Sequence, residues 1–220
     1  MNSGDLPLGT VSFLFSDIEG STRMLQELGD AFRPVLERHN TIVHEAANSH
    51  RGRIVKNEGD GFFVAFQSAL DAVSSAVEIQ RQLAAEDWES PQNVMVRIGV
   101  HTGEGRLGGS DYVGIDVHRA ARIGDSGHGG QTLVSEATAR LVEYSLPEGT
   151  RLEDLGTHRL RDLTHEEHIF QLSVEGLSTE FPPLRTLTSS KGNLPIRDLT
   201  LVGRQLEKDS VLVAWRSRGW

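Results

Sequence analysis

Two aspartates lie beside glycine-containing turns in this sequence of 220 residues. Asp17 follows the apolar run 11–15 and precedes a Gly-Ser-Thr triplet at 20–22, and Asp60 lies within the acidic turn 57–61. Either aspartate alone would usually be a turn former or a helix cap. A carboxylate beside a turn of free backbone amides can, however, hold a divalent cation while the amides bind phosphate. Mg²⁺ needs only one or two protein carboxylates when substrate phosphates complete its shell. The combination therefore indicates a metal-dependent phosphate site.

Strands and a hairpin must position these two acids. Residues 11–15 form a β-rich apolar run that ends in a polar turn, which predicts a buried strand leading into a helix. Residues 53–56 and 62–66 flank the turn 57–61, whose two glycines permit the positive φ angles of a tight hairpin. We therefore expect two antiparallel strands with an acidic tip. Further strands are expected at 94–100, 131–134, 157–160 and 168–172.

The segments between the expected strands have apolar residues at helical spacing. Apolar residues recur at steps of three to four from residue 24 to residue 46, with an interruption at Gly29 and Asp30. Pro34 fits only if Asp30 caps a second helix, because amides of the first turn have no partner within the helix. We therefore expect two consecutive helices. Ser68 followed by Asp71 has the form of a capping box. Helices are expected after it, to about residue 83, and at 115–123 and 137–142.

This order of elements predicts an α+β fold. A βααβ unit is followed by a βαβ unit and smaller elements, which gives a ferredoxin-like βααββαβ arrangement with one mixed sheet and helices mainly on one face. After about residue 173 the composition turns to Pro, Ser, Thr and Leu, as in linkers.

Composition excludes several classes of function. Lys and Arg number 22 against 31 Asp and Glu, and the net charge of −9 argues against a protein that binds nucleic acid without regard to sequence. No run of 18 apolar residues occurs, so we expect no membrane span, and no secretory signal is visible at the amino terminus. The absence of cysteine excludes disulfides and thiolate metal sites and fits a cytoplasmic location.

Four segments in this order resemble the catalytic domain of class III adenylate/guanylate cyclases. They read FSDIEGST at 15–22, KNEGD at 56–60, RIGVHTG at 97–103 and DYVGIDVHRAAR at 111–122. The similarity covers about residues 8–173 and is greatest to a bacterial subgroup with a short dimerisation arm. It implies the nucleotide cyclase fold for this domain.

The resemblance implies a role for each residue of the two acidic turns. Asp17 and Asp60 match the aspartates that bind two Mg²⁺ or Mn²⁺ ions per site, with the backbone carbonyl of Ile18 as a further ligand. Backbone amides of Glu19, Gly20, Ser21 and Thr22 would hold the β- and γ-phosphates. The ribose 3′-hydroxyl then attacks the α-phosphorus, pyrophosphate leaves, and a 3′,5′-cyclic nucleotide forms.

Lys56 and Asp111 match the residues that select the purine in this family. Adenine offers an acceptor at N1 and a donor at N6, which complement a lysine donor and an aspartate acceptor. Guanine has the opposite polarity and would leave both groups mispaired. ATP is therefore the predicted substrate and a guanylate cyclase is disfavoured. In isolation, Lys56 would be interpreted as a solvated hairpin lysine.

One further residue matches the family pattern, and two residues depart from it. Arg122 matches the arginine that stabilises charge on the transferring phosphoryl group. His118, however, stands where many members carry a ribose-orienting asparagine, and Glu104 stands where some members place a phosphate-binding arginine, for which Arg106 could substitute. These departures leave a second class of function open: a catalytically weak cyclase-like module that binds nucleotide and acts as a regulatory domain.

The resemblance also implies a partner. Metal-binding aspartates of one chain would combine with Lys56, Asp111, His118 and Arg122 of its mate in a head-to-tail homodimer with two composite sites. The product would serve intracellular signalling. Residues 174–220 are interpreted as a linker and a tail; 193–207 resemble the beginning of signalling ATPase domains that follow such cyclases, as in a truncated regulator. A poorly ordered terminus is the alternative.

Overall fold

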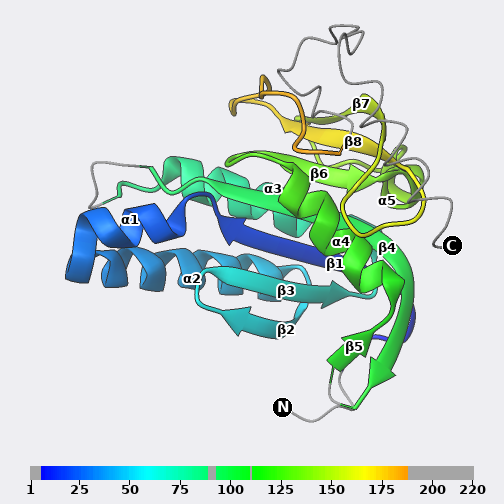
Figure 1. Ribbon diagram of the computed structural model, residues 1–220, viewed down its shortest axis with the longest axis horizontal. Coiled ribbons are helices and arrows are strands. Elements are labelled where there is room, and N and C mark those ends of the chain that lie inside the picture. The colour runs from blue at the N-terminus through cyan, green and yellow to red at the C-terminus, as the bar shows by residue number, and fades with distance from the viewer. Residues whose placement is uncertain (1–5, 89–92, 110, 188–220) are drawn as a thin grey trace, which may run out of the picture. The chain divides into compact units, whose positions relative to one another are not determined.

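The computed structural model describes residues 6–88, 93–109 and 111–187 (Figure 1). The expected tail segment 193–207 lies outside these residues. The strands are β1 (Gly9–Ile18), β2 (Arg53–Glu58), β3 (Gly61–Phe66), β4 (Val96–Gly108), β5 (Asp111–Val113), β6 (Thr132–Ser135), β7 (Thr150–His158) and β8 (Glu167–Val174). The helices are α1 (Ser21–Leu28), α2 (Phe32–Ser49), α3 (Ala69–Ala85), α4 (Ile115–Ser126) and α5 (Glu136–Val142), with a short 3-10 turn, η2 (Gly29–Ala31), between α1 and α2.

The strands form one mixed sheet. Its order is β2-β3-β1-β4-β6-β8-β7, and β5 pairs with the far part of β4. The β4–β6 pair is parallel and the other described pairs are antiparallel. The predicted α+β fold with a single mixed sheet is confirmed. Because β1 lies between β3 and β4, pairing with these two strands fixes the position of its carboxyl-terminal end.

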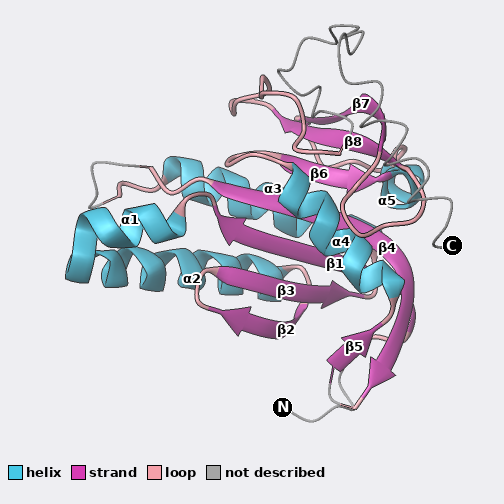
Figure 2. Cartoon of the chain, in the orientation of Figure 1, coloured by secondary structure: helices cyan, strands magenta, loops and turns pink. Residues whose placement is uncertain are grey.

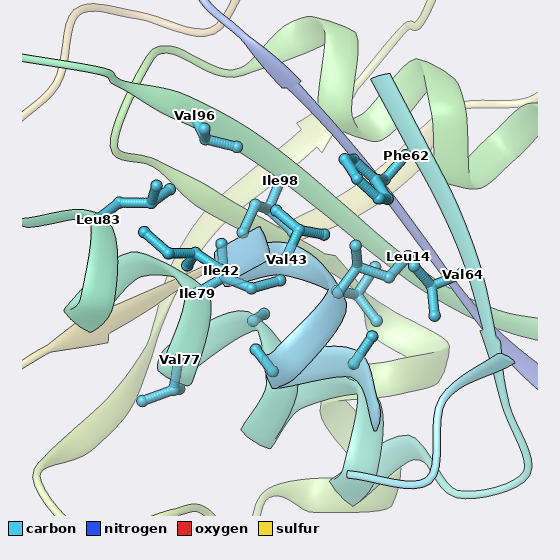
Figure 3. Packing of buried hydrophobic residues seen from close by; sticks show 14 of the residues in the cluster. Leu14, Ile42, Val43, Phe62, Val64, Val77, Ile79, Leu83, Val96 and Ile98 are labelled. Atoms are coloured by element: carbon cyan, nitrogen blue, oxygen red, sulfur yellow. The ribbon is translucent and has the colours of Figure 1, made fainter. Parts of the chain in front are cut away.

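Helices cover the two faces of the sheet unequally (Figures 1 and 2). Leu14 and Ile18 of β1 face the larger core, to which α2, α3 and α5 contribute. Val11 and Phe13 face the other side, where they pack with Ala120 of α4. The alternation follows from the two-residue period of a strand. Figure 3 shows the packing of the larger core, including Leu14, Ile42, Val43, Phe62, Val64, Ile79, Leu83, Val96 and Ile98.

Two expectations about helix starts have different outcomes. Ser68 caps α3, and its hydroxyl accepts a hydrogen bond from the Asp71 amide at 3.4 Å, as predicted. The expected cap by Asp30 is wrong. The residue before α2 is Ala31, in helical conformation and without a side-chain cap, because η2 joins the two helices and its carbonyls accept the Phe32 amide. Pro34 still lies in the first turn of α2, where no amide partner is lost.

The last strands differ from expectation at their bounds. A strand was expected at 157–160, and the structure has β7 from Thr150 to His158. This strand lies at the edge of the sheet, consists of exposed and half-buried residues only, and has a register shift between Asp154 and Thr157. An edge strand of polar sequence carries little apolar periodicity, so its start leaves no clear pattern.

The segment that follows β8 has the composition of a linker, yet it packs against the domain as far as residue 187, the last residue that the structure describes. Leu184 is 4% exposed and belongs to a cluster with Ile123, Leu133, Leu160 and Ile169. The domain therefore has packed structure up to residue 187. None of the helices in the described part of the chain combines the length and the apolarity that a bilayer span requires.

Candidate active site

A cavity of about 550 Å³ opens on the face of the sheet that α4 covers. Its lining comes from β1, β2, β3, β4, β5 and α4, so residues as far apart in sequence as Phe15 and Asp125 meet there. The polar and charged side chains in the lining include Asp17, Lys56, Arg97, Asp111, His118 and Asp125. Four of the residues singled out by sequence, Asp17, Lys56, Asp111 and His118, are thereby brought together.

Aromatic rings form the apolar wall of the cavity. Phe15 and Phe63 stack with ring centroids 4.4 Å apart and planes 13° apart, and Tyr112 meets Phe63 edge-on at 6.0 Å. The Tyr112 hydroxyl donates to the Pro7 carbonyl at 2.5 Å, and burial raises the pKa of this phenol to about 12. The wall is therefore a fixed apolar surface beside the charged groups.

Asp17 and Asp60 are anchored at the same end of β1. Asp17 lies opposite Arg97 in the β1–β4 register, and Arg97 donates to both of its carboxylate oxygens, at 2.5 and 2.6 Å. Asp60, at the tip of the β2–β3 hairpin, accepts a hydrogen bond from the Ile18 amide at 3.1 Å. That bond holds the hairpin tip beside the residue that follows Asp17.

These donors fit a divalent cation of the hard type. Carboxylate oxygens from two neighbouring elements, together with the Ile18 carbonyl, are what Mg²⁺ or Mn²⁺ prefers when a substrate supplies phosphate oxygens. Among the described residues no group of three or more His, Asp or Glu side chains converges, so the two aspartates are the side-chain candidates here. Because Arg97 holds both oxygens of Asp17, a cation must displace the guanidinium from at least one of them.

The turn between β1 and α1 presents amides, with one correction. Gly20 has φ of 74°, a left-handed conformation that favours glycine, and no side chain caps α1. Amides of the first helical turn, which begins with Ser21 and Thr22, have no partner within the helix. The Glu19 amide, in contrast, donates to the Met95 carbonyl at 2.8 Å and so supplies no free donor. Gly20, Ser21 and Thr22 remain the candidates for binding phosphate.

The Glu19 side chain has its own partners. One carboxylate oxygen pairs with Arg185 and the other accepts from the Gly129 amide at 3.1 Å. Burial alone would raise the pKa of Glu19, but the hydrogen bonds from Arg185 and Gly129 lower it below its usual value. This carboxylate is therefore held ionised beside the turn.

Lys56 and Asp111 form an ion pair at the rim of the cavity. Lys56 Nζ lies 2.5 Å from Asp111 Oδ2, although the residues belong to β2 and β5. The hydrogen bond to Asp111 raises the pKa of Lys56 above its usual value. A donor and an acceptor thus stand side by side, and both remain accessible to solvent.

Close packing positions α4 over the sheet. A Cβ atom on Gly99 would lie 2.2 Å from the backbone nitrogen of Gly124, so the glycine at this point of β4 allows the helix to approach. On the helix, His118 lines the cavity. Arg122 does not; its guanidinium pairs with Asp125 at 3.0 Å and with Asp162 at 2.8 Å. Arg122 would therefore have to leave two carboxylates to reach a ligand in the cavity.

Two side chains in or near the site, Arg97 and Asp162, have no role predicted from the sequence, and a third, Arg106, lies away from the place predicted for it. Arg97 was visible within a motif, but only the strand register places it on Asp17. Asp162, the partner of Arg122, lies in a turn without a local pattern that would identify it. Arg106 pairs with Glu104 at 2.6 Å, and neither lines the cavity. The proposed substitution of Arg106 for a phosphate-binding arginine gains no support from this position.

Comparison with known proteins identifies the family. Residues 6–173 match the model of the adenylate and guanylate cyclase catalytic domain. The chain therefore belongs to this family, and the resemblance to class III cyclases is confirmed. An uncharacterised protein of Mycobacterium tuberculosis is 39% identical over 204 residues, which is 91% of this chain and 69% of that protein. An adenylate cyclase of Schizosaccharomyces pombe is 28% identical over 204 residues, 79% of this chain but 12% of that protein.

Solved cyclases share the fold. An adenylate cyclase from Trypanosoma brucei, in its monomeric state, superposes with a TM-score of 0.75 at 24% identity and covers 84% of this chain and 97% of that one. The adenylyl cyclase CyaB from P. aeruginosa superposes with a TM-score of 0.62 at 24% identity, covering 78% and 98%. At these identities the likeness shows the nucleotide cyclase fold alone.

Proposed function

We propose that the chain is an adenylate cyclase that converts ATP to 3′,5′-cyclic AMP and pyrophosphate for intracellular signalling in the cytoplasm. The observation that carries this proposal is the Lys56–Asp111 pair at 2.5 Å, on the rim of a cavity that also contains Asp17. A lysine donor beside an aspartate acceptor complements N1 and N6 of adenine, and mispairs with guanine. In the structure these two side chains bind each other, so on binding adenine each would exchange its present partner for an atom of the base.

The chain supplies binding and charge for the reaction. Amides of Gly20, Ser21 and Thr22 bind the β- and γ-phosphates at the start of α1. His118 hydrogen-bonds the ribose, and Arg122, released from Asp162, stabilises charge on the α-phosphoryl group. The 3′-oxygen loses its proton to solvent water and bonds to the α-phosphorus. The bond between the α-phosphorus and the α,β-bridging oxygen breaks, and that oxygen leaves as part of pyrophosphate. Divalent ions held by Asp17 and Asp60 would lower the pKa of the 3′-hydroxyl and neutralise phosphate charge.

We further propose a head-to-tail homodimer with two composite sites. Arg122 lies outside the cavity of its own chain. Val113, which lines the cavity, and Ile115, two residues further along the chain, are large apolar residues that are 49% and 54% exposed. A second chain placed over this face would bury them and bring its own Lys56, Asp111, His118 and Arg122 toward Asp17 and Asp60 of the first chain.

Turnover is the first test. The purified 220-residue protein, incubated with Mn²⁺ and ATP, should release cyclic AMP. Asp17→Ala should abolish release, whereas a change of an exposed acid in η2, Asp30→Ala, should not. GTP should inhibit the conversion of ATP only weakly, because guanine mispairs with Lys56 and Asp111. Absence of cyclic AMP between pH 6 and 9 at high protein concentration would reject the proposal.

Mixing inactive variants tests the composite site. Asp17→Ala and Arg122→Ala chains are each expected to be inactive. A heterodimer of the two regains one intact site if sites are shared, so the mixture should recover part of the activity. If each chain holds a complete site by itself, the mixture stays inactive.

A second candidate function is a catalytically weak, nucleotide-binding regulatory module. The position of Arg106, paired with Glu104 outside the cavity, favours it, as does a histidine at 118. Calorimetry showing that ATP binds with Mn²⁺ while no cyclic AMP forms would support this candidate over the first.

A further inference from the structure

Residues 177–187, which we call the strap, follow β8 and lie beyond the part of the chain that the family model matches. The strap has no regular secondary structure, yet Leu184 is 4% exposed and packs with Ile123 of α4 and Leu160. Removing an apolar side chain of this size from water favours the packed position of the strap. The strap is therefore part of the packed domain.

Backbone hydrogen bonds hold the strap against elements that carry the candidate site. The Arg185 amide donates to the carbonyl of Ser126, the last residue of α4, at 2.8 Å. Two residues on, the Leu187 amide donates to the Arg159 carbonyl at 3.0 Å. His128 Nε2 lies 3.2 Å from the Pro183 carbonyl. Because these contacts lie on both sides of Arg185, the direction of its side chain is largely determined.

The Arg185 side chain reaches the turn between β1 and α1. Its guanidinium pairs with Glu19, the residue directly before Gly20, across 166 positions of sequence. Both side chains are partly exposed, 45% for Arg185 and 35% for Glu19. The pair clamps one end of the turn and neutralises a carboxylate next to the amides that are the proposed phosphate donors.

We propose that Arg185 is a positioning residue for phosphate binding. This inference rests on the proposed function and deepens it. With Arg185 in place, Glu19 is turned toward the strap and the Gly129 amide, and its charge is compensated. Without Arg185, an uncompensated carboxylate would lie beside the triphosphate and repel it. Arg185 acts through Glu19 and has no contact with the reacting atoms.

Arg185→Gln in the full chain should raise KM for ATP about fivefold or more, with kcat changed less than about twofold, because the lost compensation opposes binding of the whole triphosphate. Adding Glu19→Gln removes the carboxylate that the first change leaves unpaired, so the double variant should recover most of the loss. Arg185→Lys should lie between. Arg151→Gln, which removes another exposed ion pair, should match the unchanged protein.

Calorimetry with α,β-methylene ATP, which cannot react, measures the same effect without turnover. The analogue should bind more weakly to Arg185→Gln and recover with the added Glu19→Gln. If folded Arg185→Gln has the same affinity for the analogue and the same KM as the unchanged protein, the inference is overturned. A variant with a lower melting temperature and a lower kcat but an unchanged KM would also overturn it, because that result indicates a purely structural role. An active protein with indifferent Arg185 variants rejects this inference alone; analogue binding without cyclic AMP rejects the proposed reaction alone.

Discussion

Removing Arg97 should tighten the binding of a divalent cation. Arg97 donates two hydrogen bonds to Asp17, and the side chains are 21% and 35% exposed. Hydrogen bonds between charged groups contribute about 1.5–3 kcal/mol, and solvent screening at the partly exposed Asp17 reduces this to about 1–2 kcal/mol. A cation can bind Asp17 only if the ion pair between Arg97 and Asp17 is broken. Arg97→Gln should therefore lower the Kd for Mn²⁺ by about 5- to 30-fold.

The assay needs neither nucleotide nor turnover. Titration of the 220-residue protein with Mn²⁺, followed by electron paramagnetic resonance of the free ion, gives the Kd directly. Arg140→Gln is the matched control, since Arg140 also pairs with acidic side chains but lies on α5. Asp17→Ala should weaken binding. A folded Arg97→Gln variant whose Kd for Mn²⁺ is unchanged or higher would refute the reasoning that Arg97 and the cation compete for Asp17.

Three further changes test selectivity, packing and pH dependence. Lys56→Glu combined with Asp111→Ser should shift the ratio of kcat/KM for ATP and GTP by at least about tenfold toward GTP, because guanine has the opposite donor and acceptor pattern. Gly99→Ala should lower the free energy of unfolding by about 1–3 kcal/mol in denaturant titrations, because the new methyl group meets the α4 backbone at 2.2 Å, whereas Gly124→Ala, with its nearest contact at 3.2 Å, should cost less. Burial, assisted by Arg119, lowers the pKa of His101 to about 4. Between pH 6.5 and 4 the unfolded chain therefore binds a proton that the folded chain does not, so stability should fall by about 1 kcal/mol from pH 7.5 to 5.5.

Each of these has a result that contradicts it. Unchanged ATP preference in the active double variant would remove Lys56 and Asp111 from purine selection. Equal stability of Gly99→Ala and Gly124→Ala would show that the β4–α4 approach is not the constraint. For His101, the loss of stability below pH 6.5 should flatten in His101→Gln and persist in His165→Gln, an exposed histidine; a slope that survives in His101→Gln belongs to other groups.

Local patterns were sufficient for much of the fold. The hairpin around Asp60, the two consecutive helices after Thr22 and the Ser68 cap all depend on residues within a few positions of one another, and all are present. Hydrogen bonds within helices and turns are local, so their signals lie in short segments of sequence. The edge strand β7 has no such signal, and its start was misplaced.

Pairing between distant segments determined the rest. The motif order in the amino-acid sequence alone predicted a set of site residues, from Asp17 to Arg122, and four of them, Asp17, Lys56, Asp111 and His118, line one cavity. Only the tertiary structure placed Arg97 on Asp17, the Glu19 amide on Met95, and Arg185 on Glu19. These contacts depend on strand register and on packing between segments 76 to 166 residues apart, and no periodicity or turn signal within one segment encodes them.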